Sequence, residues 1–143
     1  MTDPLTARLL IPVASEEDAR DTIEALEKRI EPTDSTLTFV HVIEKGEGAP
    51  DKAPLQARKD QAEAIFDLIR SSLDERFELE TSLSFQGSVV EGIEEVAATT
   101  NPTAIVFAPR PGGKLTKLLS GNLTRRLISI DEYPVVVLPG PDS

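Results

Sequence analysis

Short apolar stretches alternate with longer amphipathic stretches along this chain. Five of the short stretches predict β-strands: Arg8–Val13, Thr36–Ile43, Phe77–Phe85, Thr103–Ala108 and Pro134–Leu138. Most of them are apolar at consecutive positions, which is typical of strands that are buried on both faces of a sheet. Phe77–Phe85 instead alternates apolar and polar residues, and we therefore expect it at a sheet edge.

Four segments between these strands carry apolar residues at helical spacing and predict helices. The second of them spans Leu55–Leu73, and the third ends at Asn101-Pro102. Capping boxes, with a serine followed three residues later by an acid, open the first helix at Ser15 and the third at Ser88. The positions expected to face the core in the first, third and fourth helices are Ala19, Ile23, Leu26, Ile30, Ile93, Val96, Ala97, Leu119, Leu123, Leu127 and Ile130.

Strict alternation of strand and helix predicts an α/β fold, a single domain over residues 1–143 with an open parallel sheet and helices on both faces. Ligands of such folds bind beyond the carboxyl ends of the strands, where the strand order reverses. In this chain those ends are Val13-Ala14-Ser15, His41-Val42, Gly87-Ser88 and Ala108-Pro109-Arg110.

Composition narrows the functional classes. The chain has no cysteine and a single histidine, which excludes thiolate chemistry and makes a metal site improbable. We expect His41 to bond to backbone. The net charge of −10 argues against nucleic-acid binding and suits a salt-adapted cytoplasm. No apolar run is long enough to span a membrane, and no signal peptide is recognisable, so a cytoplasmic location is expected.

Basic residues gather in one part of the sequence. No acidic residue occurs between Glu95 and Asp131, whereas five basic residues do: Arg110, Lys114, Lys117, Arg125 and Arg126. One interpretation is an anion site, since this stretch joins a strand end to a predicted helix start, where backbone N–H groups favour negative charge. The other is that these side chains are solvated and balance an acidic surface, including that of a dimer partner. Arg110, Lys114 and Lys117 fit the first interpretation better.

No catalytic motif is visible. The sequence contains no nucleophile elbow, no phosphate-binding loop of the Gly-Lys-Ser/Thr type, no dinucleotide fingerprint and no cluster of metal ligands. We therefore expect a protein that is not an enzyme.

Four segments resemble the universal stress protein family: LLIPVASEE at the first strand, FVHVIE at the second, QGSVVEGIEEVA at the third turn, and PVVVLP at the end. The resemblance runs from Arg8 to Leu138. It implies a Rossmann-like sheet with strand order 3-2-1-4-5, and a role in a stress response.

Many members of that family bind ATP through a loop of the form Gly-x2-Gly-x9-Gly-(Ser/Thr) and an Asp after the first strand. Aligned without gaps, the three glycines fall at Ala108, Pro111 and Gly121, the Ser/Thr falls at Asn122, and the Asp falls at Ala14. The candidate nucleotide- or anion-binding residues are therefore Pro12, Val13, Ala14, Val42, Ala108, Arg110, Pro111, Gly112, Gly113, Lys114, Gly121, Asn122, Leu123 and Thr124. The resemblance assigns the adenine contact to Val42.

The departures from this pattern weaken ATP binding. Proline at 111 fixes φ and removes an N–H donor, and Ala14 lacks the carboxylate that could accept hydrogen bonds from a nucleoside. Gly112-Gly113 could rebuild a cradle one residue later. Two hypotheses follow: a binding or signalling module without strong ATP binding, or an ATP-binding member in which nucleotide occupancy acts as a switch. ATP and other phosphate-bearing molecules are the candidate ligands.

The last predicted strand also suggests a partner. As the final strand, Pro134–Leu138 is expected at a sheet edge, and an unpaired apolar edge invites pairing with another chain. The resemblance likewise implies a homodimer in which two copies of this strand pair about a two-fold axis. The candidate interface residues are Val135, Val136, Val137 and Leu138.

Overall fold

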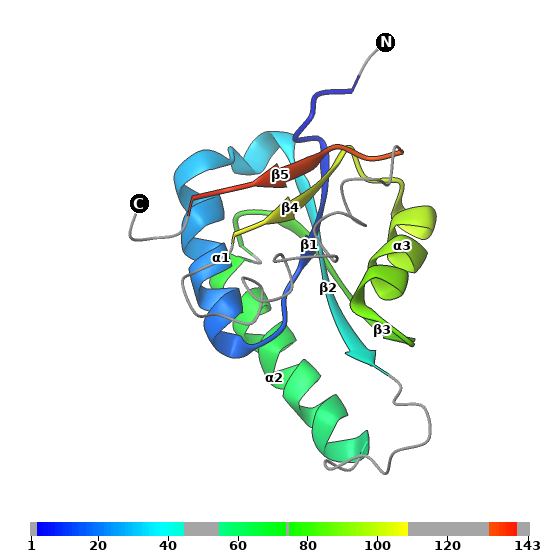
Figure 1. Cartoon of the computed structure of the whole chain (residues 1–143). Helices are drawn as coiled ribbons and strands as arrows, with labels where there is room; N and C mark the ends of the chain where they lie inside the picture. The colour runs from blue at the N-terminus through cyan, green and yellow to red at the C-terminus, as the bar shows by residue number, and fades with distance from the viewer. Residues whose placement is uncertain (1–2, 45–54, 74, 109–131, 140–143) are drawn as a thin grey trace.

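A parallel five-stranded sheet with strand order β3-β2-β1-β4-β5 forms the centre of the molecule (Figure 1). The computed structural model describes residues 3–44, 55–73, 75–108 and 132–139. In chain order the elements are β1 (Arg8–Pro12), α1 (Glu16–Arg29), the 3-10 turn η1 (Pro32–Asp34), β2 (Thr36–Glu44), α2 (Leu55–Leu73), β3 (Glu78–Gln86), α3 (Val89–Thr100), β4 (Ala104–Phe107) and β5 (Val135–Val137).

The predicted fold class and strand order are confirmed. Each of the five strands begins and ends within one residue of its predicted bounds, and α2 has the predicted bounds. β3 lies at one edge of the sheet and β5 at the other, as expected. The predicted fourth helix, with Leu119, Leu123, Leu127 and Ile130, lies outside the described residues.

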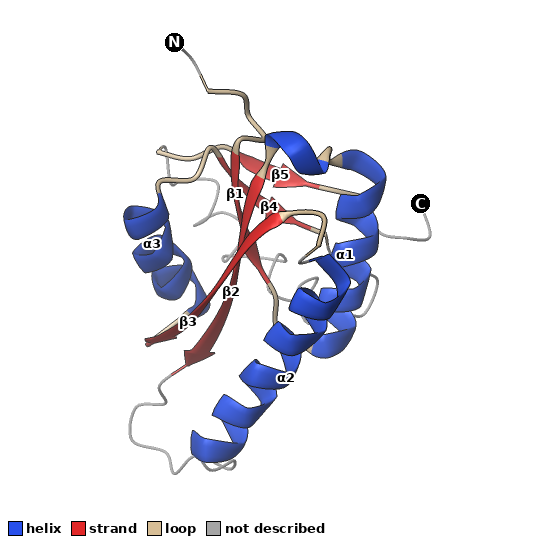
Figure 2. Ribbon diagram, turned by 180° about the vertical axis from the view of Figure 1, so that it is seen from behind, coloured by secondary structure: helices blue, strands red, loops and turns tan. Residues whose placement is uncertain are grey.

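Two apolar clusters sandwich the sheet. α1 and α2 cover one face and α3 covers the other (Figure 2). Successive residues of β1 serve both clusters, because strand side chains alternate between faces: Leu9 and Ile11 pack with α1 and α2, and Leu10 packs with α3. This double burial explains why the strand reads as a continuous apolar run.

Local signals set the ends of the helices. Ser15 caps α1, where its Oγ accepts a hydrogen bond from the backbone N–H of Asp18 at 3.1 Å, and Ser88 caps α3 in the same way with Glu91 at 3.2 Å. Asn101 ends α3 in the left-handed region with φ 47°, a conformation that asparagine tolerates better than most residues. The two serine caps direct the chain from the ends of β1 and β3 into the helices that follow, and Asn101 directs it out of α3 toward β4.

Candidate functional site

The turn after β1 lies at the carboxyl edge of the sheet and is tied to β2. Val13, 3% exposed, continues the ladder beyond β1 by donating its backbone N–H to the carbonyl of Val40 at 2.9 Å. The His41 Nδ1 lies 2.9 Å from the Val13 carbonyl oxygen in a buried contact. Because a carbonyl only accepts, Nδ1 carries the proton and donates. The expected backbone role of His41 is confirmed, and it fixes this turn.

Ala14 occupies the centre of the same turn. It is partly buried and packs against the apolar cluster on the α3 side of the sheet. The next residue, Ser15, uses its hydroxyl oxygen to cap α1. The side chains of this turn therefore supply an apolar contact and a helix cap, and Ala14 has no carboxylate to offer to a ligand.

The first turn of α1 carries acidic residues, which lie at the positive end of the helix dipole. Glu16, Glu17 and Asp18 form its first turn, and Asp18 is only 1% exposed. Negative side chains at a helix N-terminus compensate the partial positive charge that would otherwise attract an anion. This end of α1 is thus poorly suited to a phosphate, although it lies at the edge where the fold class places ligands.

Val42 on β2 is held in place by a glycine on α3. Its side chain is partly buried against the α3-side cluster. A Cβ built on Gly92 would lie 2.5 Å from Val42 Cγ2 and 2.7 Å from Cγ1, which is far inside van der Waals contact. Only glycine at position 92 lets the helix approach this closely, so Gly92 determines where the Val42 side chain lies.

The remaining described candidates on this edge are also apolar. Pro12 is buried at the end of β1, and Ala108, after β4, is 1% exposed. Val13 is buried as well, so of the described set only Ala14 and Val42, which are partly buried, can offer nonpolar contacts of the kind that suit a planar base.

The candidates expected to hold phosphate lie outside the described residues. They are Arg110, Pro111, Gly112, Gly113, Lys114, Gly121, Asn122, Leu123 and Thr124. The same holds for Lys117, Arg125 and Arg126 of the basic stretch. Their assignment to an anion site stays a prediction.

The candidate interface residues on β5 differ in exposure. Val137 is 57% exposed, Val135 and Val136 are partly buried, and Leu138 is 9% exposed. Leu138 also donates its backbone N–H to the Phe107 carbonyl at 2.7 Å, so its side chain and its N–H both serve the chain's own core. Val137 is the most accessible of the four.

The described part of the chain shows neither a metal site nor a membrane-spanning helix. Among its residues, no group of three or more His, Cys, Asp or Glu side chains is arranged to hold a metal ion. None of the helices described there is both long and apolar enough to cross a membrane.

Sequence reasoning missed the role of Gly92. The available signal was a lone glycine on the apolar face of an amphipathic helix, beside Ile93 and Val96. Such a glycine indicates close packing, but the sequence does not reveal that its neighbour across the interface is Val42.

Comparison with known proteins places the chain in a family. The model of the Universal stress protein family matches residues 6–139. No curated protein sequence matches the chain.

Solved structures share the fold. A protein from the universal stress protein family of Burkholderia pseudomallei is similar with a TM-score of 0.69 at 17% identity, covering 96% of this chain and 99% of that one. The universal stress protein from Archaeoglobus fulgidus in complex with dAMP has a TM-score of 0.59 at 19% identity, with 94% and 99% covered. A universal stress protein in complex with cAMP has a TM-score of 0.58 at 12% identity, with 92% and 95% covered.

The contact between Gly92 and Val42 generates a prediction about stability. We expect Gly92→Ala to destabilise the chain by about 1–3 kcal/mol in urea unfolding, because the added methyl group overpacks against Val42. Trimming the neighbour in the double variant Gly92→Ala/Val42→Ala should recover part of this loss beyond additivity.

Gly87→Ala is the matched control. A Cβ there would meet Glu91 Oε2 at 3.3 Å, the far end of a flexible side chain that can move aside. Equal destabilisation by Gly87→Ala and Gly92→Ala would contradict the assigned role of Gly92.

Proposed function

Because the chain belongs to the universal stress protein family, we propose that it is a small cytoplasmic binding and signalling module of a stress response, without turnover of its own. In this proposal ATP binds weakly or not at all. The module would instead act through its surface and its assembly, with phosphate-bearing ligands held by the basic stretch.

The observation that carries this proposal is Ala14. It stands where the family's ATP-binding pattern has an Asp, in a turn whose backbone is fixed by the Val13–Val40 hydrogen bond and by His41. A bound nucleoside would find a methyl group there instead of an acceptor for its N–H and O–H donors. Unmatched polar groups in a binding site lower affinity, since they lose their hydrogen bonds to water without replacement.

The second candidate function is a nucleotide-occupancy switch. It is favoured by the partly buried, apolar side chain of Val42, and by the complexes of structural neighbours with dAMP and cAMP. In this alternative, binding of a base against Val42 would signal by occupancy, with slow hydrolysis or none. Calorimetric titration of the wild-type chain with ATP, ADP and AMP, with and without Mg²⁺, separates the two proposals.

We expect the wild-type chain to bind ATP with a Kd weaker than about 1 µM in that titration. Ala14→Asp should raise the affinity roughly tenfold or more, because a charge-assisted hydrogen bond contributes on the order of 1.5–3 kcal/mol. Ala98→Asp, at an exposed position of α3, is the control that makes the same change in net charge at a residue outside the candidate crevice, the region around Ala14 at the carboxyl ends of β1, β2 and β4.

Tight ATP binding by the wild type would overturn the first proposal and support the switch. An equal response of Ala14→Asp and Ala98→Asp would show that position 14 is not the limiting feature.

We also propose that the protein assembles as a homodimer through β5. Support comes from the position of β5 at the sheet edge and from the exposed Val137 side chain. The Pro134 carbonyl and the Leu138 N–H both bond to β4. Since backbone groups alternate along a strand, the N–H groups of Val135 and Val137 point to the outer edge, where a second copy could pair.

Val137→Pro should abolish this dimer, because proline removes an outward N–H while leaving the hydrogen bonds to β4 in place. Val137→Thr is the matched control, since it keeps both the N–H and the side-chain shape. Light scattering over a range of protein concentrations gives the mass. Dimerisation of Val137→Pro at wild-type concentrations, or a wild type that stays monomeric, would contradict the proposed interface.

A further inference from the structure

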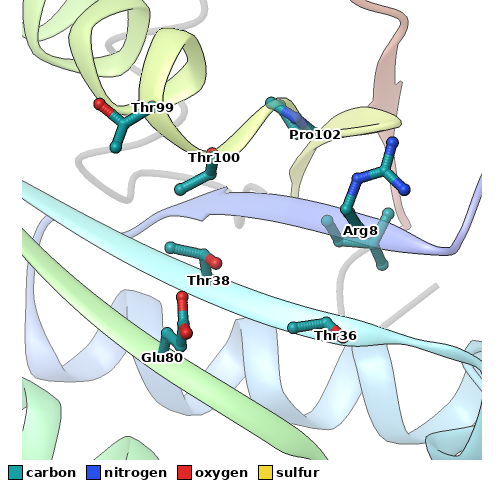
Figure 3. A pocket seen from close by; sticks show the side chains of 8 residues that line it. Arg8, Thr36, Thr38, Glu80, Thr99, Thr100 and Pro102 are labelled. Atoms are coloured by element: carbon teal, nitrogen blue, oxygen red, sulfur yellow. The ribbon is translucent and has the colours of Figure 1, made fainter.

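A pocket of about 270 Å³ opens at the amino edge of the sheet, opposite the candidate crevice (Figure 3). It is lined by the first residues of β1 and β2, by Glu80 of β3, and by the last turn of α3 with Pro102. Arg8 and Thr36 are the first residues of their strands, which places the pocket at the end that the candidate crevice does not use.

The pocket exists because α3 ends before it covers the amino ends of the strands. Toward the carboxyl edge this face of β2 carries Val40 and Val42, which pack against α3. Toward the amino edge it carries Thr36 and Thr38, which pair in register with Glu78 and Glu80 of β3. Polar side chains therefore form a floor below the point where the helix stops.

Two groups on this floor have no partner in the described part of the chain. The Thr38 side chain is only 7% exposed, yet no described group forms a hydrogen bond with its hydroxyl. The Glu80 carboxylate likewise forms no ion pair or hydrogen bond with the described residues. The neighbouring pair differs, because Thr36 Oγ1 donates to Glu78 Oε2 at 3.2 Å. The Thr38 hydroxyl oxygen is not one of the fully buried unpaired side-chain atoms of the described residues, and Thr38 lines the pocket, so this hydroxyl is available to a molecule in the pocket.

The opposite wall of the pocket is apolar. Thr99 and Thr100 donate their hydroxyls to the carbonyls of Glu95 and Val96, at 3.2 and 2.9 Å. Their oxygens are thus engaged along the helix, and Figure 3 shows the Thr100 methyl group directed toward the strands. The buried Pro102 extends this surface. A ligand would meet acceptors on the floor and methyl and methylene groups on the wall.

The charges around the pocket favour a cation. Glu80 lies on the floor, and the last turn of α3 presents the negative end of the helix with no basic residue in it. The one cation in the lining, Arg8, is already engaged: its Nη1 donates to Asp3 Oδ2 and its Nε to the Asn101 carbonyl, both at 2.9 Å. The net charge of −10 adds a field of the same sign.

We propose that this pocket binds a compact organic cation, a primary ammonium group on a short alkyl chain. The ammonium group, which has three donors and no acceptor, donates to the Glu80 carboxylate and the Thr38 hydroxyl. The alkyl chain packs between the Thr100 methyl group and Pro102. The volume lies just below the roughly 300–1,000 Å³ of pockets for drug-sized ligands, which limits the ligand to a short chain. The site is independent of the proposed nucleotide crevice.

The experiment is an NMR titration of the full chain with n-butylammonium chloride, compared with 1-butanol and sodium butyrate. We expect saturable shifts at Thr38, Glu80 and Thr100 with the ammonium compound alone. Glu80→Gln should weaken binding roughly tenfold or more, because it removes a charge-assisted hydrogen bond. Thr38→Val should weaken it about threefold to tenfold, because the methyl group fills the place of the hydroxyl without accepting a hydrogen bond.

The control is Glu94→Gln, an exposed glutamate of α3 that does not line the pocket. It changes the net charge as Glu80→Gln does, and it should leave binding unchanged. Equal weakening by both variants would reduce the effect to general attraction by an acidic protein and overturn the proposal. Absence of saturable shifts, or equal binding of butanol or butyrate, would also overturn it.

Discussion

The register between β1 and its neighbours determines where the described candidate residues at the carboxyl ends of β1, β2 and β4 lie. Arg8 pairs with Thr36 and Leu9 with Ala104. The amino ends of β1, β2 and β4 therefore lie together on one side of the sheet, and their carboxyl ends lie together on the other. The hydrogen bond from Val13 to Val40 extends this register past the end of β1, and the His41–Val13 contact fixes the turn that follows. A slip of one residue would exchange the apolar clusters on the two faces, which makes this register strongly specified.

The amino ends and the carboxyl ends of the strands consequently differ in chemistry. At the carboxyl ends of the strands the described candidate side chains are apolar, the start of α1 carries its own acids, and Gly92 lets α3 pack closely against Val42. At the amino ends of the strands α3 has ended, and threonines and Glu80 line a pocket. The same helix therefore closes one end of this face with tight packing and leaves the other end open.

Much of the fold was predictable from the sequence. Strands buried on both faces give continuous apolar runs, and Ser15, Ser88 and Asn101 mark helix ends by local hydrogen bonding and backbone conformation. The contacts between residues of the candidate site were harder to predict from the sequence. The packing of Gly92 on Val42 and the unpartnered hydroxyl of Thr38 depend on which residues meet across the sheet and its helix, and this is a property of register and helix length rather than of local sequence. The basic stretch from Arg110 to Arg126 lies outside the described residues, and its role as an anion site stays a prediction.

We propose that this member of the family does not hold ATP strongly, because Ala14 stands where the family's ATP-binding pattern has an Asp. The most direct test is the nucleotide content of the protein as purified from cells without added nucleotide. Acid extraction followed by chromatography of the released small molecules measures it. We expect the purified protein to release no ATP, or far less than one molecule of ATP per chain. Stoichiometric ATP released from the purified protein would contradict it, since only tight binding survives purification.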